Sequence, residues 1–350
     1  MIQRNAKKNA KVKLSEESVL TGKKDNGEYE QKIRPSRIDE VIGREIEKKT
    51  INMMVNSAKK RGEPVDHMLF YGPPGLGKTT FATAIANEIG SSLHITSGPA
   101  IERQGDLAAI VTNLGENDVL FIDEIHRLSR SVEEILYPAM EDRVLDIVVG
   151  KGPSAKTIRL SLKPFTLIGA TTNIGKLSSP MRDRFGLVQR LDYFNDEDLL
   201  KILQRAVVVW EMDFDDNALG EIAKRSRGTA RVALRLLRRV RDYYESISCK
   251  EDAVCPKIAL EALDLLGVDS FGFEDIDRMI LDIIWRNYNG GPVGISTLAA
   301  AVSEEEGTLV GVYEPYLMKS GFLKRTMRGR VLTEKAIDYL MKCENKKDGR

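Results

Sequence analysis

The feature that most constrains this chain is a glycine-rich octapeptide, GPPGLGKT, at Gly72–Thr79. It matches GxxxxGK[ST] completely and follows an apolar run, HMLFY, that predicts a strand over 67–71; a helical pattern over Thr79–Ile89 comes next. Glycines there permit backbone conformations that direct successive N–H groups at phosphate oxygens, and the helix N-terminus adds partial positive charge. We therefore predict a triphosphate site in which Lys78 reaches the β- and γ-phosphates and the Thr79 hydroxyl ligates Mg²⁺.

The region around this loop has the pattern of a parallel sheet flanked by helices. Short apolar runs alternate with helical patterns from Ile33 to about Leu191, which is typical of α/β folds. Two extra strand-like runs joined by a Gly/Pro/Ser-rich turn predict a β-hairpin inserted near 144–162. Besides 67–71, the expected strands of the sheet are 93–96, 119–123, 165–170 and 187–191.

The rest of the chain divides into three segments of different character. Residues 192–268 repeat apolar positions at i, i+3, i+4 and i+7, which predicts a small all-helical domain. In 269–345, three helical patterns precede FLKRTMRGRVL, where two short strands flank a basic turn, so we predict a winged helix. Residues 1–32 are rich in Lys, Glu, Asn and Ser without apolar periodicity, and we expect a disordered tail there.

Composition excludes several classes of protein. The 350 residues contain no stretch of about 18 uninterrupted apolar residues, so a membrane-spanning helix is not expected. Three cysteines without CxxC spacing exclude a disulfide scaffold and a zinc ribbon. The first residues have no apolar core of a secretory signal, so we expect a cytoplasmic protein. The net charge of +1 neither favours nor excludes a nucleic-acid partner, so that inference depends on how the charges are distributed along the chain.

Two of the predicted strands end in polar residues that are candidates for catalysis. VLFIDEIH delivers Asp123 and Glu124 at the carboxyl end of a buried strand, where α/β sheets bind ligands. We expect Asp123 to ligate Mg²⁺ and Glu124 to polarise an attacking water; a helix N-cap is the alternative. PFTLIGATTN ends with Thr171, Thr172 and Asn173. We expect one of these residues to orient the attacking water. The alternative is that the threonines are there only because β-branched residues suit a strand end.

Arginines mark three further candidate sites. SSPMRDRFG holds Arg182 and Arg184, which follow the strand expected over 165–170. An arginine that cannot reach its own nucleotide can reach a neighbour's and stabilise transition-state charge, an effect worth about 10³–10⁵ in rate. Arg231 begins a helix of the helical domain and is a candidate γ-phosphate contact. The final hairpin carries four cations, Lys324, Arg325, Arg328 and Arg330, before the next acid, which favours phosphate binding by a wing over a merely soluble hairpin.

The order of these motifs is that of the AAA+ ATPases, and their detail closely resembles the RuvB family. The matching segments are RPSRIDEVIG, GPPGLGKTT, VLFIDEIHRL, PAMED, PFTLIGATTN, SSPMRDRFG and YEPYLMKSGFLKRTMRGR, and the resemblance extends over about residues 33–342. It implies a homo-hexameric ring that encircles double-stranded DNA and hydrolyses ATP with Mg²⁺. It also implies branch migration of Holliday junctions in recombination and repair, with loading on the four-way junction by a RuvA-type protein.

The resemblance also assigns roles to individual residues. Thr172 takes the sensor-1 place, Arg184 that of the finger acting in trans, and Arg231 the sensor-2 place. Nucleotide contacts are implied at Ile33, Arg34, Gly75, Lys78, Thr79, Thr80, Glu141, Asp142, Arg143, Arg184, Phe194 and Arg231. DNA contacts are implied at Arg325 and Arg330. The hairpin residues Leu145, Ile147 and Val149 are implied to dock the RuvA-type partner, with their alternation offering an exposed apolar ridge.

Three positions depart from the family pattern. Phe194 stands where a tyrosine is usual, Asn173 where an arginine is usual, and Ala230 where a proline is common. None of these changes removes a catalytic group, so we expect an active ATPase. Two other functions stay open. One is a different AAA+ machine: the basic winged helix argues against an unfoldase, and the missing cysteine-bearing finger argues against a clamp loader. The other is an ATP-switched DNA-binding regulator that does not translocate.

Overall fold

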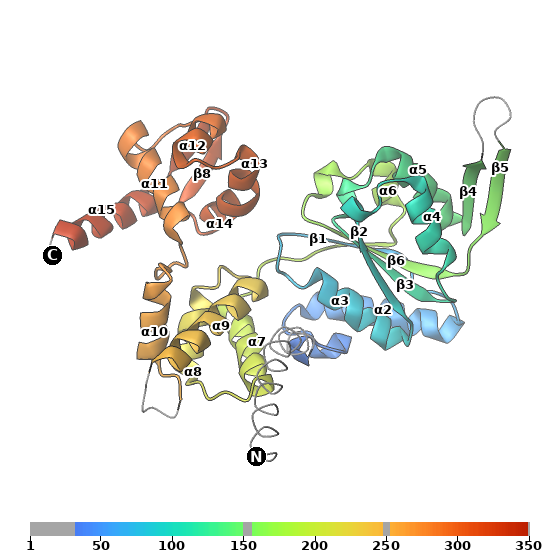
Figure 1. Cartoon of the computed structure of the whole chain (residues 1–350), viewed down its shortest axis with the longest axis horizontal. Helices are drawn as coiled ribbons and strands as arrows, with labels where there is room; N and C mark the ends of the chain where they lie inside the picture. Colours follow the sequence, from blue (N-terminus) through green and yellow to red (C-terminus); the bar gives the residue numbers. More distant parts are fainter. Residues whose placement is uncertain (1–31, 150–155, 248–252, 349–350) are drawn as a thin grey trace, which may run out of the picture. The chain divides into compact units, whose positions relative to one another are not determined.

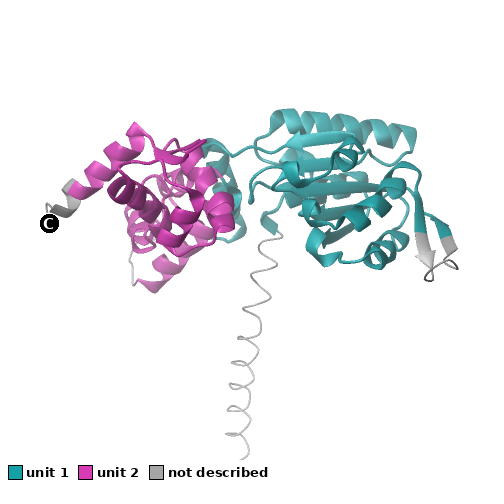
Figure 2. Ribbon diagram, turned by 90° about the horizontal axis from the view of Figure 1, so that it is seen from above, with its two compact units in different colours: residues 1–212, 229–231 teal, residues 213–228, 232–350 magenta. Residues whose placement is uncertain are grey.

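The computed structural model describes residues 32–149, 156–247 and 253–348. The expected tail, 1–32, therefore lies outside the described residues except for its last position. The chain forms two compact units (Figures 1 and 2). Among the described residues, one unit comprises those up to Met212 together with Thr229–Arg231, and the other comprises Asp213–Gly228 and those from Val232 onward.

The first unit is built on a parallel sheet, and its strand order decides which loops meet. Among the described residues the order is β2-β3-β6-β1-β7, and every neighbouring pair is parallel. The strands are β1 (Met68–Tyr71), β2 (Leu93–Ser97), β3 (Asp118–Asp123), β6 (Phe165–Thr171) and β7 (Leu187–Arg190). β6 is buried along its whole length and β3 along all but its last residue, as the continuous apolar runs of a covered parallel sheet require. The carboxyl ends of β1, β3 and β6 consequently share one edge.

Helices cover both faces of this sheet (Figure 1). α2 and α3 lie on one face, and α4, α5 and α6 lie on the other. The helices of the unit are α2 (Glu45–Arg61), α3 (Lys78–Ile89), α4 (Gln104–Thr112), α5 (Arg130–Glu141), α6 (Ser179–Asp183) and α7 (Asp196–Val209). The predicted α/β class is thus confirmed.

The structure corrects one prediction about the surface of the inserted hairpin. β4 (Val144–Val149) pairs antiparallel with β5 (Lys156–Ser161). The resemblance places Leu145 on an exposed ridge, but its side chain is fully buried and belongs to the core cluster that contains Met140 and Phe165. The physical reason is that β4 leaves directly from α5, so its first inward-facing residue still packs against the domain core. The side chains of Ile147 and Val149 lie outside the described part of the chain.

The second unit contains a helical segment followed by a winged helix. The helical segment consists of α8 (Asp216–Lys224), α9 (Ala230–Ser246) and α10 (Pro256–Leu265). The winged helix contains α11 (Asp275–Tyr288), α12 (Ile295–Val302), α13 (Glu306–Thr308), a π-helical turn (Leu309–Tyr313), α14 (Glu314–Lys319), β8 (Leu323–Thr326), β9 (Gly329–Leu332) and α15 (Glu334–Asp348). This arrangement confirms the predicted winged helix.

Aromatic rings organise the core of the winged helix. Phe273 and Phe322 are both fully buried, and their ring centroids lie 4.8 Å apart at an interplanar angle of 87°. Tyr339 of α15 meets both rings edge-on, the geometry that aromatic quadrupoles prefer. In the described ranges we find no helix with both the length and the apolarity to cross a membrane.

Candidate nucleotide and DNA sites

The glycine-rich loop connects β1 to α3 and is shaped as a phosphate cradle. Gly75 and Gly77 have φ angles of 78° and 88°, in the left-handed region that glycine enters without steric cost. A Cβ atom on Gly75 would lie only 2.8 Å from Cβ of Arg231. Glycine is therefore needed here both for the backbone angle and for the close approach of Arg231, which lies in the same unit as the loop.

Lys78 lies at the centre of the cradle and is only 8% exposed. Its ammonium donates hydrogen bonds to the carbonyl oxygens of Gly72 and Pro73, at 2.8 and 2.9 Å. Burial lowers the pKa of Lys78, while the nearby carboxylates of Glu124 and Asp123 favour its charged form. A bound triphosphate can replace the loop carbonyls as the partner of the Lys78 ammonium, and a divalent cation can replace Lys78 beside the two carboxylates. The arrangement therefore fits a site for a triphosphate and a divalent cation.

The strand ends of β3 and β6 meet beside this loop. The hydroxyl of Thr172 donates to the carboxylate of Glu124, with Oγ1 3.0 Å from Oε2, and the amide N–H of Thr172 donates to the same oxygen at 3.3 Å. Oδ1 of Asp123 accepts from the backbone N–H of Glu124 at 2.9 Å. Glu124 has a φ of 47°, a left-handed backbone that is uncommon outside glycine. The structure thus brings the candidate metal ligand, base and water-orienting residue together.

Two residues of this site were missed by sequence reasoning. The first is His126, whose Nδ1 lies 3.1 Å from the carboxylate of Glu124 and 2.8 Å from Oγ1 of Thr171. Burial lowers the pKa of His126, and the carboxylate of Glu124 opposes this shift. Its place two residues after Glu124, in VLFIDEIH, was a usable signal, because a polar residue shortly beyond a strand end remains close to that end.

Arg44 was also missed, and it explains the position of Phe194. The Arg44 guanidinium donates to the carbonyl oxygens of Leu76 and Asp192, at 3.0 and 2.8 Å. It lies 4.4 Å from the centroid of the Phe194 ring, within cation–π distance. Phe194 is only 9% exposed. No spacing rule connects residues so far apart in the chain, so the sequence carried no signal for this contact.

The N-terminal residues of the described chain lie against α3. Ile33 is buried and Arg34 is exposed. The side-chain amide of Asn87, which belongs to α3, donates to the carbonyl oxygen of Ser36 at 3.0 Å. The segment that contains the predicted nucleotide contacts Ile33 and Arg34 is therefore anchored on the helix that begins at Lys78.

A second set of candidate residues gathers away from the loop. Arg184 donates to the carbonyl oxygen of Pro180 at 2.7 Å and to the carboxylate of Glu141 at 3.2 Å. Its guanidinium lies 4.3 Å from the ring centroid of Tyr137. Glu141, Arg143 and Arg184 line one cavity of about 670 Å³, whose described lining includes no residue of the glycine-rich loop. Asp142, which caps α5, lies between Glu141 and Arg143 in the chain.

The four cationic side chains of the wing differ in their exposure to solvent. Lys324, Arg325 and Arg328 are exposed, whereas Arg330 is 5% exposed and forms an ion pair with Glu314 of α14. The resemblance implies a DNA contact at Arg330, but in this structure its side chain is buried, whereas that of Arg325 is exposed. The reason is tertiary: the backbone of Arg330 pairs with Val293 through hydrogen bonds of 2.8 and 3.0 Å, which covers β9 and turns this side chain inward.

Three family models match consecutive parts of the chain. The Holliday junction DNA helicase RuvB P-loop domain matches residues 33–191, the RuvB AAA lid domain matches 194–269, and the RuvB C-terminal winged helix domain matches 270–341.

Whole proteins match as well. A Fusobacterium nucleatum protein named Holliday junction branch migration complex subunit RuvB is 55% identical over 320 residues, which are 91% of this chain and 96% of that protein. A solved structure of the Thermotoga maritima RuvB Holliday junction branch migration motor has 47% identity and a TM-score of 0.79, and the match covers 88% of this chain and 98% of that one. A point mutant of the Thermotoga protein matches over the same shares with 48% identity and a TM-score of 0.80.

Proposed function

Because this chain belongs to the RuvB family, we propose that it is an ATP-driven motor that moves Holliday junctions along duplex DNA in recombination and repair. The single observation that carries this proposal is that RuvB family models match all three parts of the chain, 33–341, without a long gap. A complete phosphate loop and an exposed cationic wing in the same chain support it. Since the substrate is DNA, we propose a cytoplasmic location.

We propose that the cradle binds ATP and Mg²⁺. The backbone N–H groups of the loop, including those at Gly75 and Thr80, and the ammonium of Lys78 bind the phosphates. The hydroxyl of Thr79 and the carboxylate of Asp123 hold Mg²⁺, which supplies neutralisation of phosphate charge when it is bound. Arg231 contacts the γ-phosphate, a role supported by its position against Gly75.

Glu124 is the proposed general base for hydrolysis. Its carboxylate takes a proton from the attacking water, and Thr172 keeps the carboxylate oriented through hydrogen bonds from its hydroxyl and its amide N–H. A general base of this kind contributes about 10²–10⁴-fold to the rate. Nδ1 of His126 lies 3.1 Å from Oε2 of the same carboxylate, the oxygen that Thr172 also contacts, so the base is held before the nucleotide binds.

We propose that Arg184 acts on the nucleotide of a neighbouring subunit in a hexameric ring. This is supported by the cavity that Arg184 shares with Glu141 and Arg143, because the lining residues described there do not include the chain's own loop. Glu141, Asp142 and Arg143 are then further contacts of the neighbour's nucleotide. On assembly, Arg184 exchanges its contact with Glu141 for the phosphates, which carry more negative charge.

The proposed DNA contacts are Arg325 and its exposed neighbours Lys324 and Arg328. They lie on one hairpin of the winged helix and have the charge needed to follow a phosphate backbone. The proposed docking site for a RuvA-type partner is the β4–β5 hairpin, through the predicted residues Ile147 and Val149. Ile158 of β5, which is 47% exposed, adds to the apolar surface in place of the buried Leu145.

The proposal is tested by dissociation of a synthetic four-way junction with ATP, Mg²⁺ and the cognate RuvA-type protein. We expect dissociation that requires hydrolysis, so a non-hydrolysable ATP analogue and the Lys78→Ala variant should both be inactive. Multiple ATP turnovers without any junction dissociation would favour the other AAA+ machines. Nucleotide-dependent DNA binding without turnover would favour the regulator.

A further inference from the structure

The first residues of α9 belong to the unit that contains the phosphate loop. Thr229–Arg231 group with the first unit, although the residues on both sides of them belong to the second. Arg231 lies directly against Gly75 of the loop. The two residues before this segment, Arg227 and Gly228, have φ angles of 55° and 72°, so the chain turns sharply there. Arg231 is thus separated from Arg227 by only three residues of the chain.

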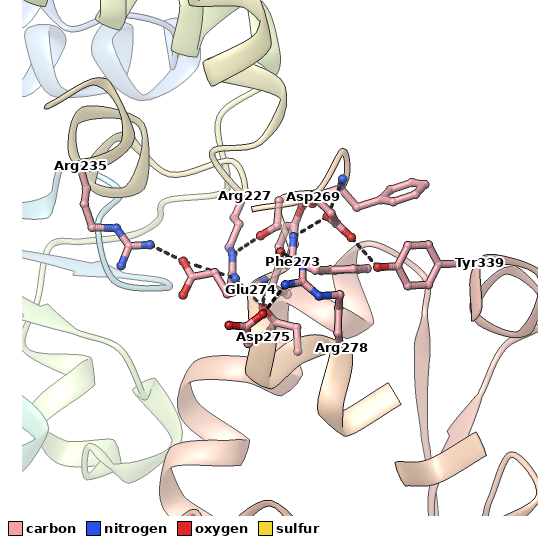
Figure 3. Close-up of polar contacts among 12 residues, drawn as sticks. Arg227, Arg235, Asp269, Phe273, Glu274, Asp275, Arg278 and Tyr339 are labelled. Atoms are coloured by element: carbon pink, nitrogen blue, oxygen red, sulfur yellow. Dashed lines mark hydrogen bonds and ion pairs between the residues drawn. The ribbon is translucent and has the colours of Figure 1, made fainter. Parts of the chain in front are cut away.

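Arg227 is not a free surface arginine, because it contacts three parts of the winged helix (Figure 3). Its Nε donates to the carbonyl oxygen of Gly272 at 2.8 Å, and its Nη2 donates to Oδ2 of Asp277 at 2.5 Å. The guanidinium also lies 5.3 Å from the ring centroid of Tyr316 and 3.7 Å from the carboxylate of Glu274. The side chain is 11% exposed.

Asp277 depends on the charge of this arginine. It is fully buried in α11, and burial raises the pKa of Asp277, which the charge of Arg227 opposes. Oδ2 also accepts from the backbone N–H of Glu274 at 2.8 Å, while Oδ1 has no partner among the described residues. A buried carboxylate that loses its cation is strongly destabilising, so the pair holds α11 to the segment that carries Arg227.

Two further contacts join the chain at the start of α11 to the residues on either side of Arg227. A Cβ on Gly272, whose φ is 74°, would lie 2.5 Å from the carbonyl oxygen of Arg225, so the two backbones touch. Arg235 of α9 donates to Glu274 at 2.6 Å (Figure 3). The start of α11 is thus fixed to both sides of the turn that precedes Arg231.

α11 in turn packs against the strands of the wing. Leu281 and Ile284 of α11 share one buried cluster with Leu323 of β8 and Leu332 of β9. The hairpin that these strands form carries Arg325 and Arg328. A continuous series of contacts consequently runs from Arg227 through Asp277 and the core of the winged helix to the wing, and Arg231 lies four residues after Arg227 in the chain.

We propose that Arg227 is a positioning residue that transmits the nucleotide state sensed by Arg231 to the DNA-binding wing. Its ion pair with Asp277 makes the turn before α9 and the start of α11 move as one body. The inference rests on the proposed function, because it assigns the path by which ATP turnover would act on DNA. In this path Arg227 itself contacts neither the nucleotide nor DNA.

The test separates transmission from simple stability by removing one or both partners in the full-length protein. Arg227→Met leaves the Asp277 carboxylate buried without its cation, so the melting temperature should fall. Arg227→Met combined with Asp277→Asn removes both charges and should recover most of that loss. The matched control is Arg278→Met, because Arg278 donates to Phe273 and Asp275, both near the start of α11, and belongs to the same helix as Asp277.

We expect nucleotide affinity, DNA affinity and ATPase without DNA to stay within about twofold of wild type in all three variants. The increase in ATPase caused by duplex DNA should fall at least tenfold in the single and the double variant, but not in Arg278→Met. A double variant that regains both stability and DNA stimulation would show that the pair is only a structural brace and overturn the inference. An equal loss in Arg278→Met would overturn it as well.

Hydrogen exchange keeps the inference testable even if the motor function is wrong. A non-hydrolysable ATP analogue should change amide exchange in the first turn of α9 and in α11 of the wild-type protein. In the double variant the change in α9 should remain and the change in α11 should disappear. An α11 response equal to that of wild type would reject transmission through Arg227. Failure of wild type to dissociate junctions would instead reject the proposed function.

Discussion

The hydroxyl of Thr172 donates a hydrogen bond to the carboxylate of Glu124, although the two residues lie 48 positions apart in the chain. β3 and β6 are neighbours in the sheet, and this adjacency places the residue after β6 beside the residue after β3. The hydrogen bond restrains the proposed base. Substitutions at the two positions should therefore affect turnover in a graded way.

Glu124→Gln should leave nucleotide affinity near that of wild type and reduce steady-state ATP hydrolysis by about 10²–10⁴-fold, because the amide does not accept the water's proton. Thr172→Val should cause a smaller loss, roughly tenfold, since one hydrogen bond to a charged group is worth about 1.5 kcal/mol. Nucleotide-binding titrations measure the first property and steady-state kinetics the second. Near-normal turnover in Glu124→Gln would exclude it as the base.

Arg184→Ala should fold and bind ATP but hydrolyse it poorly, since the missing group acts on a neighbour's nucleotide. Mixing this variant with Lys78→Ala should partly restore hydrolysis, because mixed rings contain some interfaces with an intact Lys78 and an intact Arg184. The measurement is ATPase activity as a function of mixing ratio, with subunit exchange verified separately. Absence of any rescue in verified mixed rings would argue against a shared site.

Replacing Arg325 and Arg328 together with Ala should reduce the magnitude of the slope of log K against log[salt] for duplex DNA by about 1.8, at roughly 0.9 for each phosphate that the wing no longer neutralises. The decrease in affinity should be similar for unrelated duplex sequences, because backbone contacts carry no base information. Binding titrations at several salt concentrations check both points. An unchanged slope would place the DNA contacts elsewhere.

Arg330→Ala is the matched control for the wing and should behave differently. Arg330 and Glu314 are both buried and paired, so removal of one partner should lower the free energy of unfolding by about 3–5 kcal/mol. The slope of DNA affinity against salt, measured at a temperature where the variant is folded, should stay close to that of wild type. Chemical denaturation gives the stability. A reduced slope with unchanged stability would restore Arg330 as a phosphate contact.

From the environment of the Asp118 carboxylate we expect the stability of the folded protein to depend on pH. Burial opposes its ionisation, but the backbone N–H of Gly115 at 2.7 Å and the ring of His94 at 2.8 Å lower the pKa of Asp118 below its ordinary value of 3.8. Its contribution to stability is therefore complete above about pH 3.8 and is lost as the pH falls through the lower value in the folded state. Asp118→Asn should cost about 1–3 kcal/mol at pH 7, and denaturation curves should show the difference shrinking below pH 3.8. A constant difference would assign the effect to shape rather than charge.

Local patterns in the sequence determined the architecture and the identity of the phosphate loop. GPPGLGKT between a strand and a helix specified a phosphate site because the chemistry lies within eight consecutive residues. Alternating apolar runs specified the α/β class, and the basic hairpin after three helical patterns specified the winged helix, since periodicity records which faces are buried. The proposed roles of Glu124, Arg184 and Arg231 rest on motif position and family resemblance and stay predictions.

Tertiary structure alone decided which side chains are free to act. Arg325 and Arg330 look equivalent in FLKRTMRGRVL, yet Glu314 and Val293 enclose Arg330 while Arg325 stays exposed, and Leu145 is drawn into the core by the helix before it. The contacts of Arg44 with Phe194 and of Arg227 with Asp277 join residues 150 and 50 positions apart. No spacing rule reaches across such distances, because an arginine's partners depend on how separate elements pack and not on its neighbours in the chain.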